Sequence, residues 1–193
     1  MVFFLSLALP VESSENDDVL GLIVFKADLH DPRRALASWS EDSASPRNWT
    51  GIQCSPQSGT VTQVTLDGLE LSGPLGRGLL KLDHLQSLEA LGASENRLSG
   101  SIPAGVGSLS RLSSLDLSHN SLSGEIPPEL GQCQMLVSLD LSYNLLSGEI
   151  PSFLESLSRL EVLRLPGNSF SGGVPEWIVR SSRSSTSRRT ISG

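Results

Sequence analysis

The second half of the chain is organised by a pattern of apolar and polar positions that recurs every 24 residues. Four segments read LGASENRLSGSIP, LDLSHNSLSGEIP, LDLSYNLLSGEIP and LRLPGNSFSGGVP. In each of them two apolar residues alternate with polar ones just before an asparagine. This period-two alternation is typical of a short β-strand with one buried face. The pattern therefore predicts one short strand in every repeat.

A single short strand cannot bury its apolar face alone, so the copies must stack and pair into one parallel sheet. The glycine and the proline in every repeat exclude amphipathic helices of any length, and the proline favours an extended return path. We therefore expect an α/β solenoid with a parallel concave β-sheet and an irregular or 3-10 convex side. The solenoid is expected over residues 61–179, as one irregular half-repeat plus four 24-residue repeats.

The repeated asparagines are polar residues among leucines, and a buried polar group needs hydrogen-bond partners. We expect each side-chain amide to bridge backbone groups at the tight bend after the strand. A structural ladder of asparagines is a better interpretation than a row of ligand contacts. Its members are Asn96, Asn120, Asn144 and Asn168.

The first repeat departs from the regular spacing. From Gly73 to Gly100 the distance along the chain is 27 residues instead of 24. The three extra residues are expected near residues 88–93, where they would form a bulge. An imperfect gene model is the alternative, and the sequence does not choose between them.

The segment before the repeats, residues 15–60, has the composition of an N-terminal cap. Asp17 and Asp18 are a helix start signal, an apolar run covers residues 19–29, and Asp31-Pro32 is a stop signal. A second short turn is expected over residues 35–39. A solenoid needs such a segment to cover its first repeat.

Both ends of the chain fall outside the repeat pattern. Residues 1–14 are interpreted as a signal-peptide remnant, because the apolar run is too short for a bilayer and no Lys or Arg precedes it. A disordered apolar stub is the alternative. Residues 180–193 carry four arginines among serines and are expected to be a disordered tail. A basic binding arm is the weaker alternative, and no C-terminal cap pattern is recognisable.

The charge distribution narrows the classes of partner. The formal net charge is −7, but all four basic residues of the tail lie beyond residue 179. The remainder holds 10 of the 14 basic side chains and all 21 acidic ones, which is a net charge of −11. An acidic body disfavours nucleic acid and anionic lipid, whose phosphates attract basic surfaces. It fits basic or neutral ligands, and no segment is long and apolar enough for a transmembrane helix.

The sequence contains no motif for catalysis. His30, His84 and His119 are scattered, and no set of Cys, His or acidic residues has the spacing of a metal site. Motifs of serine hydrolases, zinc proteases and phosphate-binding loops are absent. We therefore expect neither an enzyme nor a cofactor. Asp116 and Asp140 recur one repeat apart and suggest a cation site, but an ordinary polar sheet face is the favoured interpretation.

A binding surface follows from the expected geometry. Side chains between the inward leucines project from the parallel sheet onto the concave face. Tyr143 and Arg164 are the best hot-spot candidates, because such side chains give large contact area or bidentate hydrogen bonding. The candidate ligand-binding residues are Asp116, His119, Asp140, Tyr143, Glu161 and Arg164. In addition, Asn48-Trp49-Thr50 is an N-glycosylation sequon, which predicts a glycan on a surface loop of a secreted chain.

Four motifs carry a resemblance to a known family: VLGLIVFKADLHDP in the cap, the ALASW turn, the NWTGIQC box and the LSGxIP repeats. Over residues 15–179 the chain resembles the ectodomains of plant leucine-rich-repeat receptor-like kinases, with the kinase part absent. The cap is more similar to a branch whose kinases are described as inactive. The resemblance implies extracellular recognition of a peptide ligand or of another receptor ectodomain, in a secreted protein or at the outer face of the plasma membrane. A secreted inhibitor of a cell-wall-degrading enzyme and a nonfunctional partial gene product are the alternatives.

The cysteines depart from the family pattern. The family carries a cysteine two residues before the tryptophan of the box, paired with the cysteine after it. Here Arg47 occupies that place, so Cys54 lacks this partner, and Cys133 replaces an inward leucine. The two cysteines are about three coils apart, on the order of 15 Å. A disulfide needs Cα atoms within roughly 7 Å, so we expect two thiols and no disulfide.

Overall fold

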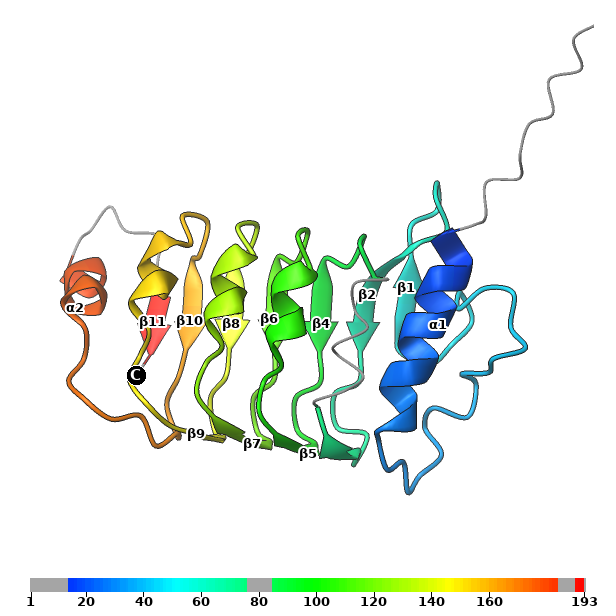
Figure 1. The fold of residues 1–193 in the computed structure, drawn as a ribbon, viewed down its shortest axis with the longest axis horizontal. Coiled ribbons are helices and arrows are strands. Elements are labelled where there is room, and N and C mark those ends of the chain that lie inside the picture. Colours follow the sequence, from blue (N-terminus) through cyan, green and yellow to red (C-terminus); the bar gives the residue numbers. More distant parts are fainter. Residues whose placement is uncertain (1–13, 76–84, 184–189, 193) are drawn as a thin grey trace, which may run out of the picture.

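The computed structural model describes residues 14–75, 85–183 and 190–192. Its strands stand side by side along the long axis of the molecule, with a cap helix at one end and a second helix at the other (Figure 1). A seven-stranded sheet has the order β1-β2-β4-β6-β8-β10-β11, and a four-stranded sheet has the order β3-β5-β7-β9. The predicted leucine-rich-repeat solenoid with a parallel sheet is confirmed.

The seven-stranded sheet is built from the alternating segments of the repeats. All its neighbours are parallel except β1 and β2, which are antiparallel. The central leucines of successive strands pair directly and are buried, because each strand turns its apolar residues to the same side. The strands are β1 (Ile52–Cys54), β2 (Val61–Thr65), β4 (Ala90–Gly92), β6 (Ser114–Asp116), β8 (Ser138–Asp140), β10 (Val162–Arg164) and β11 (Thr190–Ser192).

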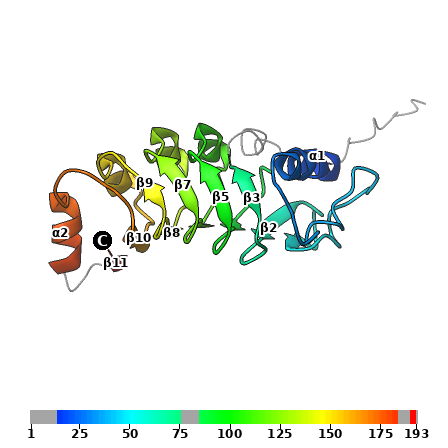
Figure 2. The same cartoon turned by 90° about the horizontal axis from the view of Figure 1, so that it is seen from below.

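The LSGxIP part of each repeat makes the rest of the coil. Its first residues form the second sheet, which contains β3 (Ser72–Pro74), β5 (Arg97–Gly100), β7 (Ser121–Gly124) and β9 (Leu145–Leu146). The proline then holds an extended backbone and is followed by one turn of 3-10 helix. These helices lie on the side opposite the seven-stranded sheet (Figure 2). The described ones are η2 (Ala104–Ser108), η3 (Pro128–Gln132) and η4 (Ser152–Ser156).

The extra residues of the first repeat do not lie where the sequence suggested. Strands β4 and β6 pair without a bulge, and Leu85 is buried 24 positions before its counterpart Leu109. By contrast, the buried Leu75 and its counterpart Ile102 are 27 positions apart. The three residues are therefore inserted between Leu75 and Leu85, and the predicted bulge near residues 88–93 is wrong. Buried leucines fix the register from Leu85 onward, which the spacing of glycines could not reveal.

The cap begins with helix α1 (Ser14–Ala27), which starts and ends a few residues earlier than predicted. Its buried Asp18 carboxylate accepts a hydrogen bond of 2.7 Å from the backbone N–H of Val61 in β2. The indole rings of Trp39 and Trp49 stack with centroids 5.5 Å apart, and Trp39 donates to the Thr50 carbonyl. The Asp18 bond ties the cap to the first coil, and the tryptophan contacts hold the cap itself together, without a disulfide.

Both cysteines are thiols in the structure. Cys133 is fully buried in the row of inward side chains that also contains Leu109 and Leu157, and its thiol donates to the Val106 carbonyl at 3.3 Å. Burial raises the pKa of the Cys133 thiol to about 11. Cys133 therefore has the environment of a small core residue.

The C-terminal segment differs from the expected disordered tail wherever the structure describes it. Helix α2 (Glu176–Arg183) buries Trp177 and Ile178, and β11 pairs in parallel with β10. Helix α2 and strand β11 therefore pack on the coil of β10, which no repeat motif signals. At the other end, the expected signal-peptide remnant, residues 1–14, lies outside the described residues except for Ser14.

Candidate binding surface on the concave sheet

Two carboxylates of the concave sheet are held by the serine that follows them. In register, β4, β6, β8 and β10 place Gly92, Asp116, Asp140 and Arg164 side by side. The Asp116 Oδ1 atom accepts hydrogen bonds from the Ser118 backbone N–H at 3.0 Å and from its hydroxyl at 2.7 Å. Asp140 makes the same pair of bonds with Ser142, two residues further along the chain. The Asp-x-Ser sequence thus orients each carboxylate locally.

The two aspartates differ in what remains accessible. Arg164 donates from Nη1 to Oδ2 of Asp140 at 3.3 Å, and Asp140 is only 9% exposed. Asp140 is therefore largely withdrawn from the surface, whereas the Arg164 side chain is 48% exposed. Within the described part of the chain, Oδ2 of Asp116 accepts no hydrogen bond, and the residue is half-buried. Asp116 is consequently the more available of the two predicted acids.

Asp67 joins this surface and was missed by the sequence reasoning. Its Oδ1 atom accepts hydrogen bonds from the backbone N–H and the hydroxyl of Ser94, at 2.7 and 2.9 Å. A Cβ atom placed on Gly92 would lie 3.1 Å from Asp67 Oδ2, so the carboxylate occupies the space above that glycine. The Asp67 carboxylate thus lies beside Gly92, which is the residue in register with Asp116 on the neighbouring strand. Aligning Asp67 with the serine of the later repeats was the available signal.

The bend that ends each concave strand has left-handed backbone in every coil. The equivalent residues have φ between 53° and 73°, and they are Gly68, Glu95, His119, Tyr143 and Gly167. The rings of His119 and Tyr143 stack with centroids 4.4 Å apart and planes inclined by 18°. A Cβ atom on Gly167 would lie 2.7 Å from Tyr143 Cδ1, so the tyrosine ring covers that glycine. The result is an exposed aromatic pair at the carboxyl ends of β6 and β8.

The asparagines fix this bend from below. Asn144 donates from Nδ2 to the Leu117 carbonyl of the preceding coil at 2.9 Å, and its Oδ1 accepts from the Leu122 N–H at 3.0 Å. Asn96, Asn120 and Asn168 make corresponding bonds. Each amide therefore ties two coils together directly beneath the residue that presents its side chain at the bend.

The charged side chains of the concave strands are unevenly distributed. Arg111 and Arg159 are exposed near the amino ends of the strands, while the bends at the carboxyl ends carry no basic residue among the described coils. Glu161 lies immediately before β10 and is half-buried. Six acids and one base belong to the strand positions and bends: Asp67, Glu89, Glu95, Asp116, Asp140, Glu161 and Arg164.

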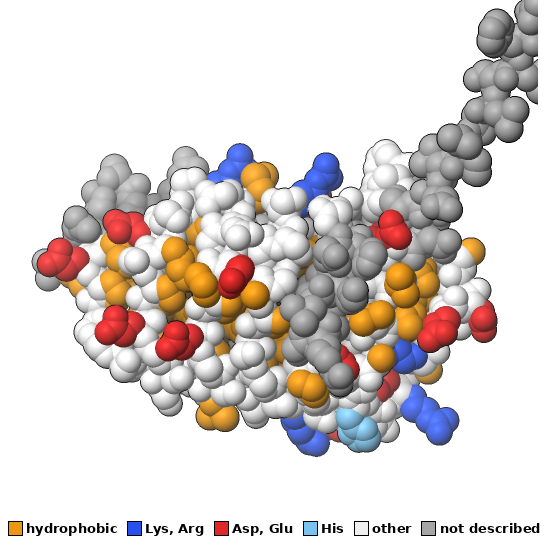
Figure 3. All heavy atoms as spheres, viewed as in Figure 1, with side chains coloured by type: hydrophobic (Ala, Val, Ile, Leu, Met, Phe, Trp, Pro, Cys, Tyr) orange, Lys and Arg blue, Asp and Glu red, His pale blue; other side chains and the backbone are white. Residues whose placement is uncertain are grey.

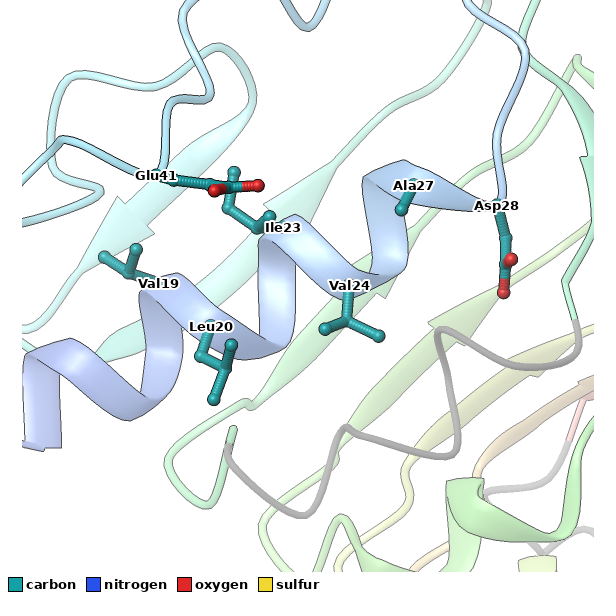
Figure 4. A pocket seen from close by; sticks show the side chains of 7 residues that line it. All are labelled: Val19, Leu20, Ile23, Val24, Ala27, Asp28 and Glu41. Carbon is teal, nitrogen blue, oxygen red and sulfur yellow. The ribbon is translucent and has the colours of Figure 1, made fainter.

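The other faces offer less for recognition. On the side of the 3-10 helices, hydrophobic side chains are interspersed with uncharged ones, and the charges are scattered (Figure 3). A hollow of about 670 Å³ lies along α1 and is lined mainly by aliphatic side chains (Figure 4). Among the residues that the structure describes, no group of three His, Cys, Asp or Glu side chains could hold a metal ion. The described helices include none that is long and apolar enough to cross a membrane.

The stacked coils, the asparagine ladder and the helical cap define a leucine-rich-repeat protein. Residues 15–55 match the leucine rich repeat N-terminal domain, and residues 111–133, 135–157 and 159–180 match the Leucine Rich Repeat family. The BIR2 ectodomain of Arabidopsis thaliana is 39% identical, with a TM-score of 0.75, over 83% of this chain and 84% of that one. A chain in the BIR3–SERK2 complex of the same plant is 38% identical, with a TM-score of 0.78, over 91% and 94%.

The chain belongs to the family of plant leucine-rich-repeat receptor ectodomains. It is also similar to full-length receptors of Arabidopsis thaliana. A protein named "Probable LRR receptor-like serine/threonine-protein kinase IRK" is 52% identical over 104 residues, which are 52% of this chain and 10% of that protein. The inactive LRR receptor-like kinase BIR2 is 39% identical over 106 residues, 53% of this chain and 17% of that protein. This chain therefore spans less than a fifth of these two receptors.

Proposed function

We propose that this chain is the binding module of a receptor-like protein and has no catalytic activity of its own. Its concave sheet binds a peptide or the ectodomain of another receptor on the extracellular side of the plasma membrane. The observation that carries the proposal is the exposed His119–Tyr143 pair beside Asp116 and Arg164. These side chains combine a large aromatic area with charges of both signs, as binding hot spots do.

Several of the similar solved structures are complexes with a peptide or with another receptor, which supports these two classes of ligand. They include PEPR1 with AtPEP1, HAESA with the peptide hormone IDA, and the BIR3–SERK2 complex. Peptide ligands and partner ectodomains are therefore the two classes to test. Asn48 is exposed on a cap loop, which is the setting in which a secreted chain carries a glycan.

The test uses the full chain secreted from plant cells and a double variant, Tyr143→Ala with Arg164→Ala. The chain is screened by biolayer interferometry against the SERK2 ectodomain and a display library of secreted plant peptides. We expect binding by at least one of them and a loss of affinity of about 10-fold or more in the double variant.

The matched control is Arg97→Ala with Leu145→Ala, which removes an exposed arginine and an exposed large side chain from the second sheet. We expect this control to bind like the unaltered chain. Retained affinity in the concave variant, or the absence of any binder in both arms of the screen, would contradict the proposal. Glycosidase treatment of the secreted chain tests Asn48 separately, with Asn48→Gln as the variant that should not change mobility.

A further inference from the structure

We propose that the open end of the His119–Tyr143 stack is a subsite for an arginine side chain that a polypeptide partner presents. This inference rests on the proposed function and specifies the chemistry of its ligand. The subsite consists of the outer face of the His119 ring, the Glu95 carboxylate and the free oxygen of Asp116.

The stack ends at His119 on the side of the preceding coil. Tyr143 packs between His119 on one side and Gly167 on the other, and 54% of the residue is still exposed. The exposed His119 ring stacks on Tyr143 through one face, and its other face is turned toward the preceding coil, where no ring of the described structure contacts it. A planar guanidinium stacks on such a ring, whereas a compact ammonium does not match its shape.

The charges beside that face favour a cation. Glu95 occupies the equivalent bend position one coil before His119 and is exposed. Asp116 is held through Oδ1 alone, and its Oδ2 has no donor among the described residues. Strands in a sheet are about 4.8 Å apart, so acids on neighbouring coils lie within reach of one extended side chain.

No described side chain of this chain neutralises these carboxylates. Arg164 is the one basic residue of the described concave strands, and it is engaged by Asp140. Asp67, on the far side of Glu95, adds a further acid to the same end of the sheet. The resulting negative potential attracts a basic group and gives no advantage to a neutral sugar, which would also stack on the ring.

The experiment compares the affinities of three capped peptides for the full chain. The peptides are Ac-Gly-Ser-Arg-Ser-Gly-NH₂ and its counterparts with citrulline or lysine in place of arginine. Citrulline keeps the planar group and removes the charge, whereas lysine keeps the charge and removes the plane. Binding is followed by the ring resonances of His119 and Tyr143 in NMR titrations. We expect the arginine peptide to bind about 5-fold more tightly than either counterpart, as two exposed charge pairs and one stacked ring allow.

Variants separate the two parts of the subsite. Glu95→Gln with Asp116→Asn removes both charges and retains an acceptor for Ser118, so the fold is preserved and the preference over citrulline should disappear. His119→Ala should abolish the preference for the arginine peptide over the lysine peptide. Glu125→Gln, which removes an exposed acid after β7 on the second sheet, is the matched control and should change nothing.

Equal affinities for the arginine and citrulline peptides, or a preference that survives Glu95→Gln with Asp116→Asn, would overturn the inference. Cellohexaose is added to the unaltered chain and to the Glu95→Gln with Asp116→Asn variant as a further probe. Equal shifts of the His119 and Tyr143 resonances in these two proteins, without any preference for the arginine peptide, would assign the stack to saccharides instead. The proposed function fails by a different result, which is unchanged partner binding in the Tyr143→Ala and Arg164→Ala variant. The two failures can therefore be told apart, and the proposed function can stand when the arginine subsite is lost.

Discussion

Replacement of Asn144 by alanine tests how the coils are held together. The Asn144 side chain is 5% exposed and lies between the third and fourth coils of the described solenoid. Its Nδ2 donates to Leu117 of the preceding coil and to the nearer carbonyls of Leu141 and Ser142, at 2.9, 3.2 and 3.3 Å. Its Oδ1 accepts from the Leu122 N–H. Alanine removes all of these bonds at a site that water does not reach.

The magnitude follows from the one group that is left without a partner and from the bonds that are lost. The Leu122 N–H is buried, and an unsatisfied buried group costs about 1–3 kcal/mol. The Leu117 carbonyl keeps a bond of 3.2 Å from Nδ2 of Asn120, so its loss is smaller, and the two local bonds to Leu141 and Ser142 are longer and contribute less. We therefore expect the free energy of unfolding to fall by about 2–4 kcal/mol. Asn168→Ala, in the half-buried last copy, should cost less.

Guanidinium unfolding followed by tryptophan fluorescence measures the loss. His119→Ala is the control, because it removes an exposed side chain from the same bend and should change stability by less than about 0.5 kcal/mol. Asn144→Asp separates the donor from the acceptor, since it retains the bond from Leu122 and loses those to the carbonyls. A cost of Asn144→Ala below about 1 kcal/mol would refute the ladder as a source of stability.

Three further substitutions test the core and the two ends. The Cys133 thiol ionises at a lower pH in the unfolded chain than in the folded one, so the free energy of unfolding should fall as pH rises from 9 toward 11. In paired denaturation curves, Cys133→Ala should remove about 2 kcal/mol of that fall by pH 10.5. Asp18→Ala leaves the Val61 N–H unsatisfied, so hydrogen exchange in the cap should accelerate by an amount equivalent to about 1–3 kcal/mol, whereas unchanged exchange would remove this anchor from the account. Trp177→Ala opens an apolar cavity under α2 and should cost about 3 kcal/mol, with lost exchange protection in β10 and β11; protection that persists would show that α2 does not cover the last coil.

The regular part of the solenoid was predictable because its signal is repeated. Four asparagines at one spacing specify the strand, the bend and the stacking together. An irregular copy can therefore be interpreted from the regular copies beside it. The insertion in the first repeat has no second copy, so glycine spacing could not show on which side of Leu85 it lies. Strand β11 pairs through backbone groups in a segment without apolar alternation, and periodicity gives no sign of it.

The candidate surface was predictable only in part for a similar reason. The alternation placed Asp116, Tyr143 and Arg164 on the concave sheet, but accessibility depends on contacts between coils. Asp140 is withdrawn because Arg164 of the next strand bonds to it. Asp67 belongs to the surface because Gly92 of the next coil has no side chain to exclude it. Such relations become visible when repeats are aligned as neighbours in space.

A hydrogen-exchange footprint of the full chain with its tightest partner from the binding screen shows whether the concave sheet is the recognition surface. We expect slower exchange at the bends after β4, β6 and β8 and in β10, together with unchanged exchange in η2, η3 and η4. Protection of the 3-10 helices with no change at the concave bends would contradict it.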